Sequence, residues 1–278
     1  MFQDIKPKIM NTQYVHRQIK LTDNVVIVKG QQALFIDDHL PVMADIKKNY
    51  PTQSFTPIHL LSIHGRDFFF IDRELPERDN LAYDSLNVVR ASRPKWQAFA
   101  TVTAVHLAVW YTKTRFCGHC GAHMQLGDGE RKMVCPNCGN EVFPRISPAI
   151  IVGVRNHDKL LLTKYSTGYN HYALIAGFVE IGETLEETVR REVYEETGLE
   201  VKNIEYYHSQ PWGFSQSVLV GFFADLADNE TYENDEYKDD REELAVTKWF
   251  RRQDIPNDDN TLSLTWTMIQ AFRKGEIK

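Results

Sequence analysis

Four cysteines in two close pairs place the strongest constraint on how this chain folds. The pairs are Cys117-Gly-His-Cys120 and Cys135-Pro-Asn-Cys138, and the chain has no other cysteine. A Cys-x-x-Cys turn directs two thiolates toward one point, and two such turns supply the four ligands that Zn²⁺ takes at tetrahedral geometry. The alternative, disulfide bonding, is disfavoured in a reducing compartment. The spacing therefore predicts one closed, structural zinc site.

Two histidines close to the first pair, His119 and His123, are alternative zinc ligands. Four cysteines complete a tetrahedral site without them, so we interpret both histidines as solvated neighbours. A zinc ribbon is also compatible with nucleic-acid binding. Its basic residues, His119, Arg131 and Lys132, are too few to favour that function.

Charge and hydropathy exclude several classes of protein. The chain has 32 Lys and Arg against 38 Asp and Glu, a formal net charge of −6 that disfavours a protein coating nucleic acid. No run approaches the roughly 18 apolar residues that a membrane helix requires. The first residues lack the apolar core of a signal peptide. We therefore expect a cytoplasmic protein that does not associate with membranes.

Apolar patterning predicts a mixture of strands and helices. Residues 24–37 and 59–72 each contain two apolar runs around a turn, which is typical of hairpins. Residues 95–116 have apolar residues at helical spacing and contain neither Gly nor Pro, which predicts a helix that ends where the cysteines begin.

The second half of the chain repeats this mixture. Strands are predicted within 148–165, at 217–226 and at 246–250, and residues 262–274 form an amphipathic segment. The whole pattern indicates an α+β protein of about two domains with a metal ribbon between them.

An acidic helix is predicted between Thr184 and Gly198. Thr184 and Glu187 form a capping box at its start, and Gly198 suits its end. Glu192, Glu195 and Glu196 then share one arc of the helix surface. Like charges at this spacing destabilise a helix by a few tenths of a kcal/mol, about 0.2–0.5 per pair, unless a hard cation such as Mg²⁺ or Mn²⁺ lies between them. The alternative interpretation is a solvated acidic face.

The stretch from Gly177 to Leu199 resembles, residue for residue, the signature of the Nudix hydrolases, G-x5-E-x7-R-E-U-x-E-E-x-G-U, where U is apolar. The resemblance implies a Nudix α/β/α sandwich with a mixed sheet. It also implies an enzyme that splits a nucleoside diphosphate linked to another group, using water activated by Mg²⁺ or Mn²⁺.

The resemblance assigns a role to each matching residue. Glu192, Glu195 and Glu196 would bind the catalytic metal, and Glu196 would also position or deprotonate water. Arg191 and Glu183 would form an ion pair that orients the helix and the loop before it. Gly177 would allow a tight turn of the backbone, and the carbonyl of Ala176 would be a further metal ligand.

The order of segments narrows the resemblance to the NADH pyrophosphatase, or NAD(+) diphosphatase, family. That family has a four-cysteine ribbon ahead of the Nudix domain and a tract S-Q-P-W-P-F-P-x-S behind the box. Here residues 209–217 read SQPWGFSQS, with Gly213 and Ser215 in place of two prolines. The resemblance implies an N-terminal NADH pyrophosphatase-type domain at 1–112, a zinc ribbon at 113–142 and a Nudix hydrolase domain at 143–278.

Residues of the tract and a few others would line the dinucleotide pocket in such an enzyme. Trp212, Phe214 and Phe178 would contact nucleotide rings. The alternative interpretation is that Trp212 and Phe214 belong to the hydrophobic core. Their irregular Pro, Gly and Ser setting argues against the core alternative. The further lining residues would be Gln210, Pro211, Gln216, Ser217, Phe143 and Ser263. Phe143 stands where some members have Tyr, and Glu243, rather than Glu242, is placed as a metal ligand outside the helix.

On this resemblance we expect hydrolysis of NAD(H) to nicotinamide mononucleotide and AMP, with NAD-capped RNA as a second substrate class and a homodimeric assembly. Two alternatives stay open. One is an ADP-ribose or other nucleotide-sugar pyrophosphatase, and the other is a non-catalytic Nudix module that senses nucleotides. Loss of box glutamates is common in such sensors, and all are intact here.

Overall fold

The computed structural model describes residues 1–90, 92, 94–165, 172–227, 236–237, 244–257 and 262–277. Its contacts divide the chain into two units. We call Gln3–Arg145 with Gly213–Gln216 the N-terminal unit. Met1–Phe2, Ile146–Trp212 and Ser217–Lys278 form the C-terminal unit.

Two small sheets form the body of the N-terminal unit. One has the order β1 (Met10–Asn11), β5 (Ile58–Ile63), β6 (Arg66–Phe70) and β2 (Asn24–Val26), and the other joins β3 (Val28–Lys29), β4 (Gln32–Phe35) and β7 (Ala82–Ser85). Gly30 and Gly65 adopt positive φ in the turns between β3 and β4 and between β5 and β6. Both predicted hairpins are therefore confirmed.

Two α-helices and one 3₁₀ turn accompany these sheets. They are α1 (Met43–Asn49), η1 (Leu86–Val89) and the long helix α2 (Lys95–Lys113). The long helix α2 confirms the helix predicted for 95–116. Its last residue is Lys113, shortly before the first cysteine pair. Buried residues occur all along α2, which explains why its apolar positions exceed a single stripe. Among the described residues, no helix has the length and apolar character to cross a membrane.

The cysteine segment forms a three-stranded antiparallel ribbon within the same unit. Its order is β10 (Glu141–Val142), β9 (Met133–Val134) and β8 (Gln125–Leu126). Arg131 anchors the ribbon by donating to the carbonyls of Leu60 at 2.6 Å and Thr12 at 3.1 Å. Arg131 is thus used inside the protein, which further weakens the nucleic-acid interpretation of the ribbon.

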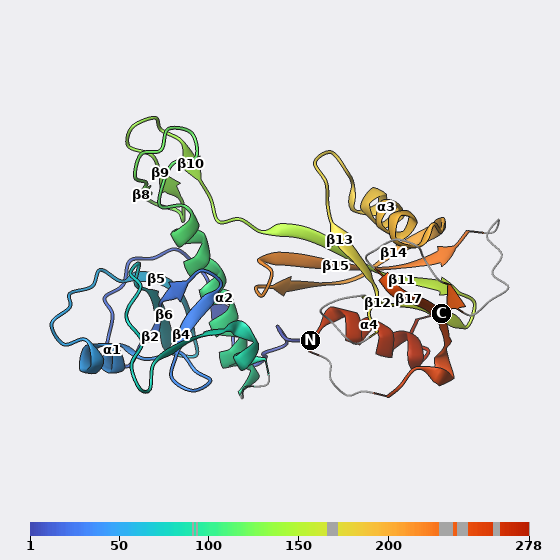
Figure 1. The fold of residues 1–278 in the computed structure, drawn as a ribbon, viewed down its shortest axis with the longest axis horizontal. Helices are drawn as coiled ribbons and strands as arrows, with labels where there is room; N and C mark the ends of the chain where they lie inside the picture. Colours follow the sequence, from blue (N-terminus) through green and yellow to red (C-terminus); the bar gives the residue numbers. More distant parts are fainter. Residues whose placement is uncertain are drawn as a thin grey trace. The chain divides into compact units, whose positions relative to one another are not determined.

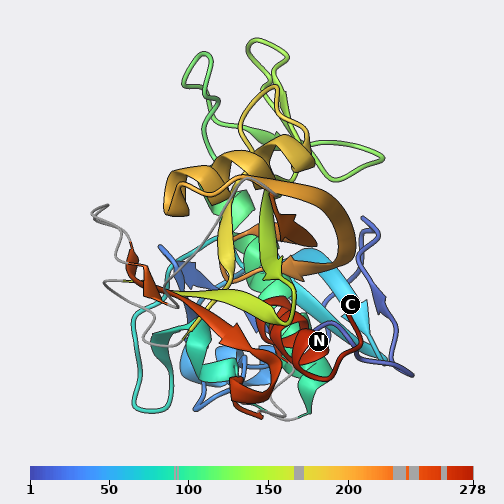
Figure 2. The same ribbon diagram turned by 90° about the vertical axis from the view of Figure 1, so that its right-hand side faces the viewer.

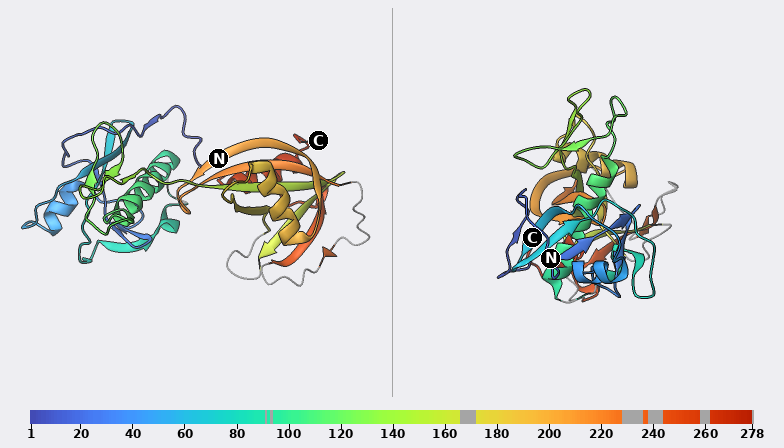
Figure 3. Two further views of the ribbon diagram at one scale, coloured as in Figure 1. Left: turned by 90° about the horizontal axis from the view of Figure 1, so that it is seen from above. Right: turned by 90° about the vertical axis from the view of Figure 1, so that its left-hand side faces the viewer.

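One seven-stranded mixed sheet forms the centre of the C-terminal unit. Its order is β14 (Val201–Trp212), β15 (Ser217–Leu226), β11 (Ser147–Asn156), β12 (Lys159–Tyr165), β17 (Leu244–Arg251) and β16 (Glu236–Tyr237), with β13 (Ile175–Phe178) also paired to β11. The β11–β15 pair is parallel and the others are antiparallel. β14 and β15 are long, curved strands (Figure 3).

Helices cover both faces of this sheet: α3 (Leu185–Thr197) lies on one face and α4 (Leu264–Arg273), which follows the 3₁₀ turn η2 (Arg252–Asp254), lies on the other (Figures 1 and 2). Val189 and Val193 of α3 pack on one cluster of buried strand residues, and Met268 and Phe272 of α4 pack on another. The predicted α+β class and the predicted α/β/α sandwich with a mixed sheet are confirmed.

Local signals fix both ends of α3. The backbone N–H of Thr184 donates to the Glu187 carboxylate at 2.7 Å, and the N–H of Glu187 donates to the Thr184 hydroxyl at 3.2 Å. Gly198 ends the helix at φ +71°, a left-handed conformation that glycine adopts without strain. The predicted capping box and helix end are confirmed.

We predict that Thr184→Ala lowers the free energy of unfolding by about 1 kcal/mol, because the Glu187 N–H at the helix start loses the hydroxyl that accepts its hydrogen bond. Chemical denaturation measures this change. The matched control is Thr103→Ala within α2, where the hydroxyl only bonds to the Phe99 carbonyl of its own helix. An equal loss in the two variants would contradict the capping role.

Candidate functional site

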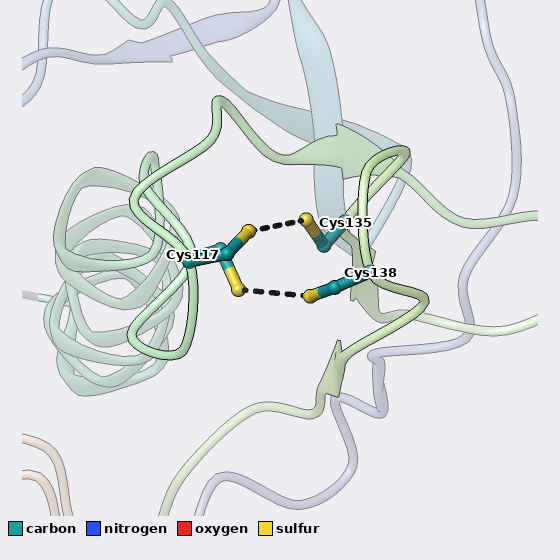
Figure 4. Close-up of side chains that lie close together, drawn as sticks. Cys117, Cys135 and Cys138 are labelled. Atoms are coloured by element: carbon teal, nitrogen blue, oxygen red, sulfur yellow. Dashed lines mark hydrogen bonds between the residues drawn. The ribbon is translucent and has the colours of Figure 1, made fainter.

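The four cysteine sulfurs gather at one point. The Sγ atoms of Cys117 and Cys138 are 3.6 Å apart, those of Cys120 and Cys135 are 3.4 Å apart, and all four lie within 4.8 Å of one another. Figure 4 shows Cys117, Cys135 and Cys138 pointing toward one another from two loops. Tetrahedral zinc with Zn–S bonds of about 2.3 Å needs sulfurs about 3.8 Å apart. The cluster therefore fits structural Zn²⁺.

Backbone N–H groups favour the thiolate form of two of these cysteines, Cys117 and Cys120. The N–H groups of Cys120 and His119 lower the pKa of Cys117 to about 6, because they donate to its sulfur and stabilise the thiolate. His119 is exposed, and the imidazole of His123 lies 2.9 Å from the Met124 carbonyl through Nδ1. Within the described residues, the metal cluster consists of the four cysteines without either histidine.

We predict about one zinc per chain, since four thiolates complete the tetrahedral site. Cys117→Ser should release the zinc and expose residues 113–143 to proteolysis, because metal binding and folding of such ribbons are coupled. Metal analysis and limited proteolysis measure the two effects. His119→Ala and His123→Ala are the controls and should keep the zinc. Less than about half an equivalent in the intact chain would refute the site.

An ion pair between Arg191 and Glu183 orders the start of the acidic helix. The guanidinium donates from Nε to Glu183 Oε1 at 2.6 Å and from Nη2 to Oε2 at 3.0 Å. It also donates from Nη2 to the carbonyl of Phe178 at 2.9 Å. This side chain therefore joins β13, the loop after it and helix α3.

The pKa values of this pair reflect their contact. The Arg191 guanidinium lowers the pKa of Glu183 to about 2, with help from the Glu180 N–H and the Thr188 hydroxyl. Glu183 in turn raises the pKa of Arg191. Both side chains therefore stay charged across the physiological pH range.

Two of the three box glutamates also contact Arg191. Its Nη1 donates to Glu192 Oε1 at 2.8 Å and to Glu195 Oε2 at 3.0 Å. Burial raises the pKa of Glu192, whereas the Glu195 side chain is 57% exposed. Glu196 is 8% exposed. Among the described residues, these three carboxylates do not form a group in which one oxygen from each lies within 4.8 Å of the others.

Gly177 leaves space for one of these carboxylates. A β-carbon at this position of β13 would overlap the carboxyl group of Glu192. Ala176, its neighbour, pairs with Ile151 of β11. Carboxylates and a backbone carbonyl are the hard oxygen ligands that Mg²⁺ and Mn²⁺ prefer, so the donor set at this end of β13 fits those ions.

We predict that Glu183→Gln destabilises the protein at pH 7. The folded-state pKa of Glu183 lies below its unfolded value of about 4.3, so its contribution is complete above that pH and disappears as the pH falls toward 2. The difference in urea midpoint between variant and wild type should shrink accordingly below about pH 4. Glu200→Gln, an exposed glutamate after α3, is the control. A difference that does not vary with pH would contradict the ion-pair role.

The predicted irregular setting of the tract at 209–217 is only partly correct. β14 continues as a strand through Trp212, the turn covers residues 213–216, and Ser217 begins β15. Pro211 is compatible with this strand because β14 is at the edge of the sheet, where a missing N–H faces away from the ladder.

Two residues expected in the substrate pocket have structural partners. The buried Gln210 amide donates to the Leu262 carbonyl at 3.0 Å and accepts from the Leu264 N–H at 2.7 Å. The Ser263 hydroxyl accepts from the Trp266 N–H at 3.3 Å at the start of α4. The Gln210 amide thus holds the start of α4 against β14, and the Ser263 hydroxyl caps that helix.

The turn of the tract belongs to the N-terminal unit, where it packs on α2. At Gly213 a β-carbon would lie 2.7 Å from Val102 Cγ1 and 3.0 Å from the Val102 carbonyl, so only glycine allows this approach. The Arg90 guanidinium lies 4.8 Å from the centre of the Phe214 ring. Gln216 adopts a left-handed φ of +57°. Gly213 in place of the family's proline therefore has a packing reason.

The remaining candidates differ in exposure. Phe178 is 54% exposed at the end of β13, and Phe143 is 48% exposed after β10. Such exposed rings are available to a flat ligand. Ser217 is buried, and Glu243, the predicted extra metal ligand, lies outside the described residues together with Glu242.

A group of residues on α2 lines a pocket that was not predicted from the sequence. A pocket of the N-terminal unit combines the turn of the tract with Val105, His106, Val109 and Lys113 of that helix. Their spacing of three and four residues places them on one helix face, which is the signal that was available. The same spacing is typical of ordinary core packing, so spacing alone does not distinguish a pocket wall from a core face.

Comparison with known proteins matches two domains in succession. Residues 113–143 match the NADH pyrophosphatase zinc ribbon domain, and residues 144–272 match the NUDIX domain. A solved NUDIX hydrolase from Nitrosomonas europaea is 22% identical, with a TM-score of 0.48, over 58% of this chain and 92% of that chain.

Curated relatives carry the name NAD-capped RNA hydrolase NudC. One from Photobacterium profundum is 35% identical over 244 residues, which cover 83% of each chain. One from Klebsiella pneumoniae is 42% identical over 153 residues, which cover 55% of this chain and 57% of the relative. The match to the Klebsiella relative thus spans little more than half of its length.

Proposed function

Because the chain belongs to the NADH pyrophosphatase family of Nudix hydrolases, we propose that it hydrolyses the diphosphate bond of NAD(H) with Mg²⁺ or Mn²⁺. The products are nicotinamide mononucleotide and AMP. The observation that carries the proposal is the acidic helix, in which Arg191 and Glu183 order Glu192 and Glu195 beside the space left by Gly177.

The electrostatics of the helix suit a diphosphate that arrives with cations. Glu183, Glu192 and Glu195 share the single positive charge of Arg191, so the group remains anionic. An anionic substrate binds there only with divalent cations between the charges. The bound metal supplies neutralisation of the diphosphate and activation of water.

The protein residues then have separate tasks. Arg191 holds the carboxylates in place, and the largely buried Glu196 accepts a proton from the attacking water. As the new P–O bond forms, the bridging P–O bond breaks and its oxygen leaves with the other phosphate. The second water proton is lost when the new phosphate ionises. Ala176, through its carbonyl, and Glu243 complete the proposed metal ligands.

The nucleotide rings require aromatic surfaces. We assign ring contacts to Trp212, Phe178 and Phe214, since base–aromatic stacking contributes about 1–3 kcal/mol per base. The other lining residues in the proposal are Phe143, Gln210, Pro211, Gln216, Ser217 and Ser263. Gln210 and Ser263 act by positioning, because the Gln210 amide holds the start of α4 and the Ser263 hydroxyl caps that helix.

NAD-capped RNA is the second substrate class that we propose, because curated relatives are named for that activity. The alternative substrates are ADP-ribose and other nucleotide sugars, which the replacement of two tract prolines by Gly213 and Ser215 favours. A non-catalytic sensor is the remaining alternative, and the intact box glutamates argue against it.

The setting of the enzyme is also part of the proposal. We propose a cytoplasmic homodimer, with the N-terminal domain at 1–112, the ribbon at 113–142 and the hydrolase domain at 143–278. Structural Zn²⁺ belongs to the ribbon, whose cysteines leave no open coordination position for chemistry.

We predict that Glu196→Gln lowers kcat for NADH by at least about 100-fold with little change in KM, because the proton acceptor is lost while the rings still bind. Steady-state kinetics with Mg²⁺ and with Mn²⁺ measure the effect. Glu186→Gln, an exposed glutamate on the same helix, is the control. Full activity of Glu196→Gln would remove this residue from the mechanism.

The same assay compares NADH, NAD⁺, ADP-ribose and NAD-capped RNA as substrates. We expect NADH or NAD⁺ to give the highest kcat/KM among the small molecules. ADP-ribose hydrolysis far above that of NADH would replace the proposed substrate. No hydrolysis of any of them would favour the sensor.

A further inference from the structure

Two buried threonines on neighbouring strands of the C-terminal unit carry hydroxyl groups with no protein partner in the described structure. Thr163 of β12 is fully buried and Thr247 of β17 is 2% exposed. Neither side-chain oxygen has a hydrogen-bond partner among the described residues. A buried hydroxyl without a partner destabilises the folded state, because it loses its hydrogen bonds to water and gains none in return. The two hydroxyls therefore indicate a partner other than the described side chains and backbone.

The two hydroxyls belong to one small region of the sheet. Thr163 and Thr247 are directly paired in the antiparallel register of β12 and β17. Directly paired residues have their β-carbons about 4.5–5.5 Å apart on the same face of a sheet. One small molecule, such as water, can therefore contact both hydroxyls.

This region lies on the face of the sheet that α3 covers, which we call the α3 face. Leu161 of β12 and Trp249 of β17 belong to the buried cluster that packs on α3, whereas Leu162 belongs to the cluster on the opposite face. Successive side chains of a strand alternate between the two faces. Thr163 is two residues from Leu161, and Thr247 is two residues from Trp249, so both threonines are on the α3 face.

Glu196 is directed toward the same face. Val189 and Val193 of α3 belong to the cluster on the α3 face, and Glu196 follows them by seven and three residues. Residues at these spacings share one side of a helix. The exposure of Glu196, 8%, agrees with a side chain that points to the sheet rather than to solvent.

The path of α3 brings Glu196 toward the two threonines. Glu192 lies directly against Gly177 of β13. The helix follows β13 in the chain and turns back over the sheet (Figure 1), so Glu196, one helical turn beyond Glu192, is directed toward the start of β13. Thr163 is paired with Ala173, just before that start.

We propose that Thr163 and Thr247 hold a water molecule on the α3 face, and that this water donates to Glu196 and fixes the orientation of its carboxylate. Buried waters typically make about three hydrogen bonds to buried polar groups, and the two hydroxyls and the carboxylate supply three. The threonines are positioning residues, because they act on the reaction through Glu196. The inference rests on the proposed function for the role of Glu196 as proton acceptor.

The test separates the hydroxyl from the methyl group at each position. Thr163→Val and Thr247→Val keep the shape and remove the hydroxyl, so each should lower kcat for NADH about 10-fold with KM and the urea midpoint unchanged. Thr163→Ser and Thr247→Ser keep the hydroxyl and remove a buried methyl group, so they should keep kcat and lower the urea midpoint. A purely structural role predicts the opposite order, with the serine variants slower than the valine variants.

Thr267→Val is the matched control, because the Thr267 hydroxyl lies on α4, on the opposite face of the sheet, and donates to the Ser263 carbonyl of its own helix at 3.0 Å. This variant should keep kcat. The inference is overturned if the valine variants at Thr163 and Thr247 keep full kcat, or if the serine variants lose as much kcat as the valine variants.

A high-resolution crystal structure tests the water independently of hydrolysis. The wild-type chain should show one water bonded to Thr163, Thr247 and Glu196, and the double variant with valine at both threonines should lack it. A wild-type chain without this water would overturn the inference. A wild-type chain that holds the water but does not hydrolyse NADH would overturn the proposed function and leave the water site established.

Discussion

The Arg191 side chain is the interaction on which the candidate catalytic site depends. One guanidinium donates to the Phe178 carbonyl at the end of β13, to both oxygens of Glu183, and to Glu192 and Glu195 on α3. The planar fork of arginine allows these simultaneous contacts, which the single ammonium of lysine does not reproduce. Because three carboxylates share one positive charge, the same contact that orders them leaves a net negative group for a divalent cation.

The zinc ribbon also depends on a single arginine, which attaches the ribbon to the rest of the N-terminal unit. The cysteines close the ribbon on itself, and Arg131 between β8 and β9 then binds the carbonyls of Thr12 and Leu60. A second hydrogen bond joins the same two parts, because the Tyr14 hydroxyl donates to the Gly127 carbonyl of the ribbon at 3.2 Å. Loss of zinc would therefore affect the N-terminal sheet as well as the ribbon, since its anchor is carried on the metal-dependent turn.

Features with local causes could be predicted from the sequence, and features with tertiary causes could not. The ends of α3 were predictable because Thr184, Glu187 and Gly198 act within one or two helical turns. The course of β14 through Pro211 was not, because proline is acceptable there only at a sheet edge, and the strand order decides which strand is the edge. The structural role of Gln210 could not be predicted either, because its hydrogen-bond partners, Leu262 and Leu264, are distant in sequence.

The tract illustrates how tertiary packing substitutes for local stiffness. Prolines restrict φ, so the family pattern at positions 213 and 215 stiffens the turn through its own backbone. This chain has Gly213 and Ser215 instead, and glycine alone is the more flexible choice. The structure compensates with contacts, because Gly213 reaches Val102 of α2 and Arg90 covers the Phe214 ring. The conformation of the turn therefore depends on α2 and η1, so residues proposed to contact a nucleotide are ordered by the N-terminal unit rather than by their own sequence.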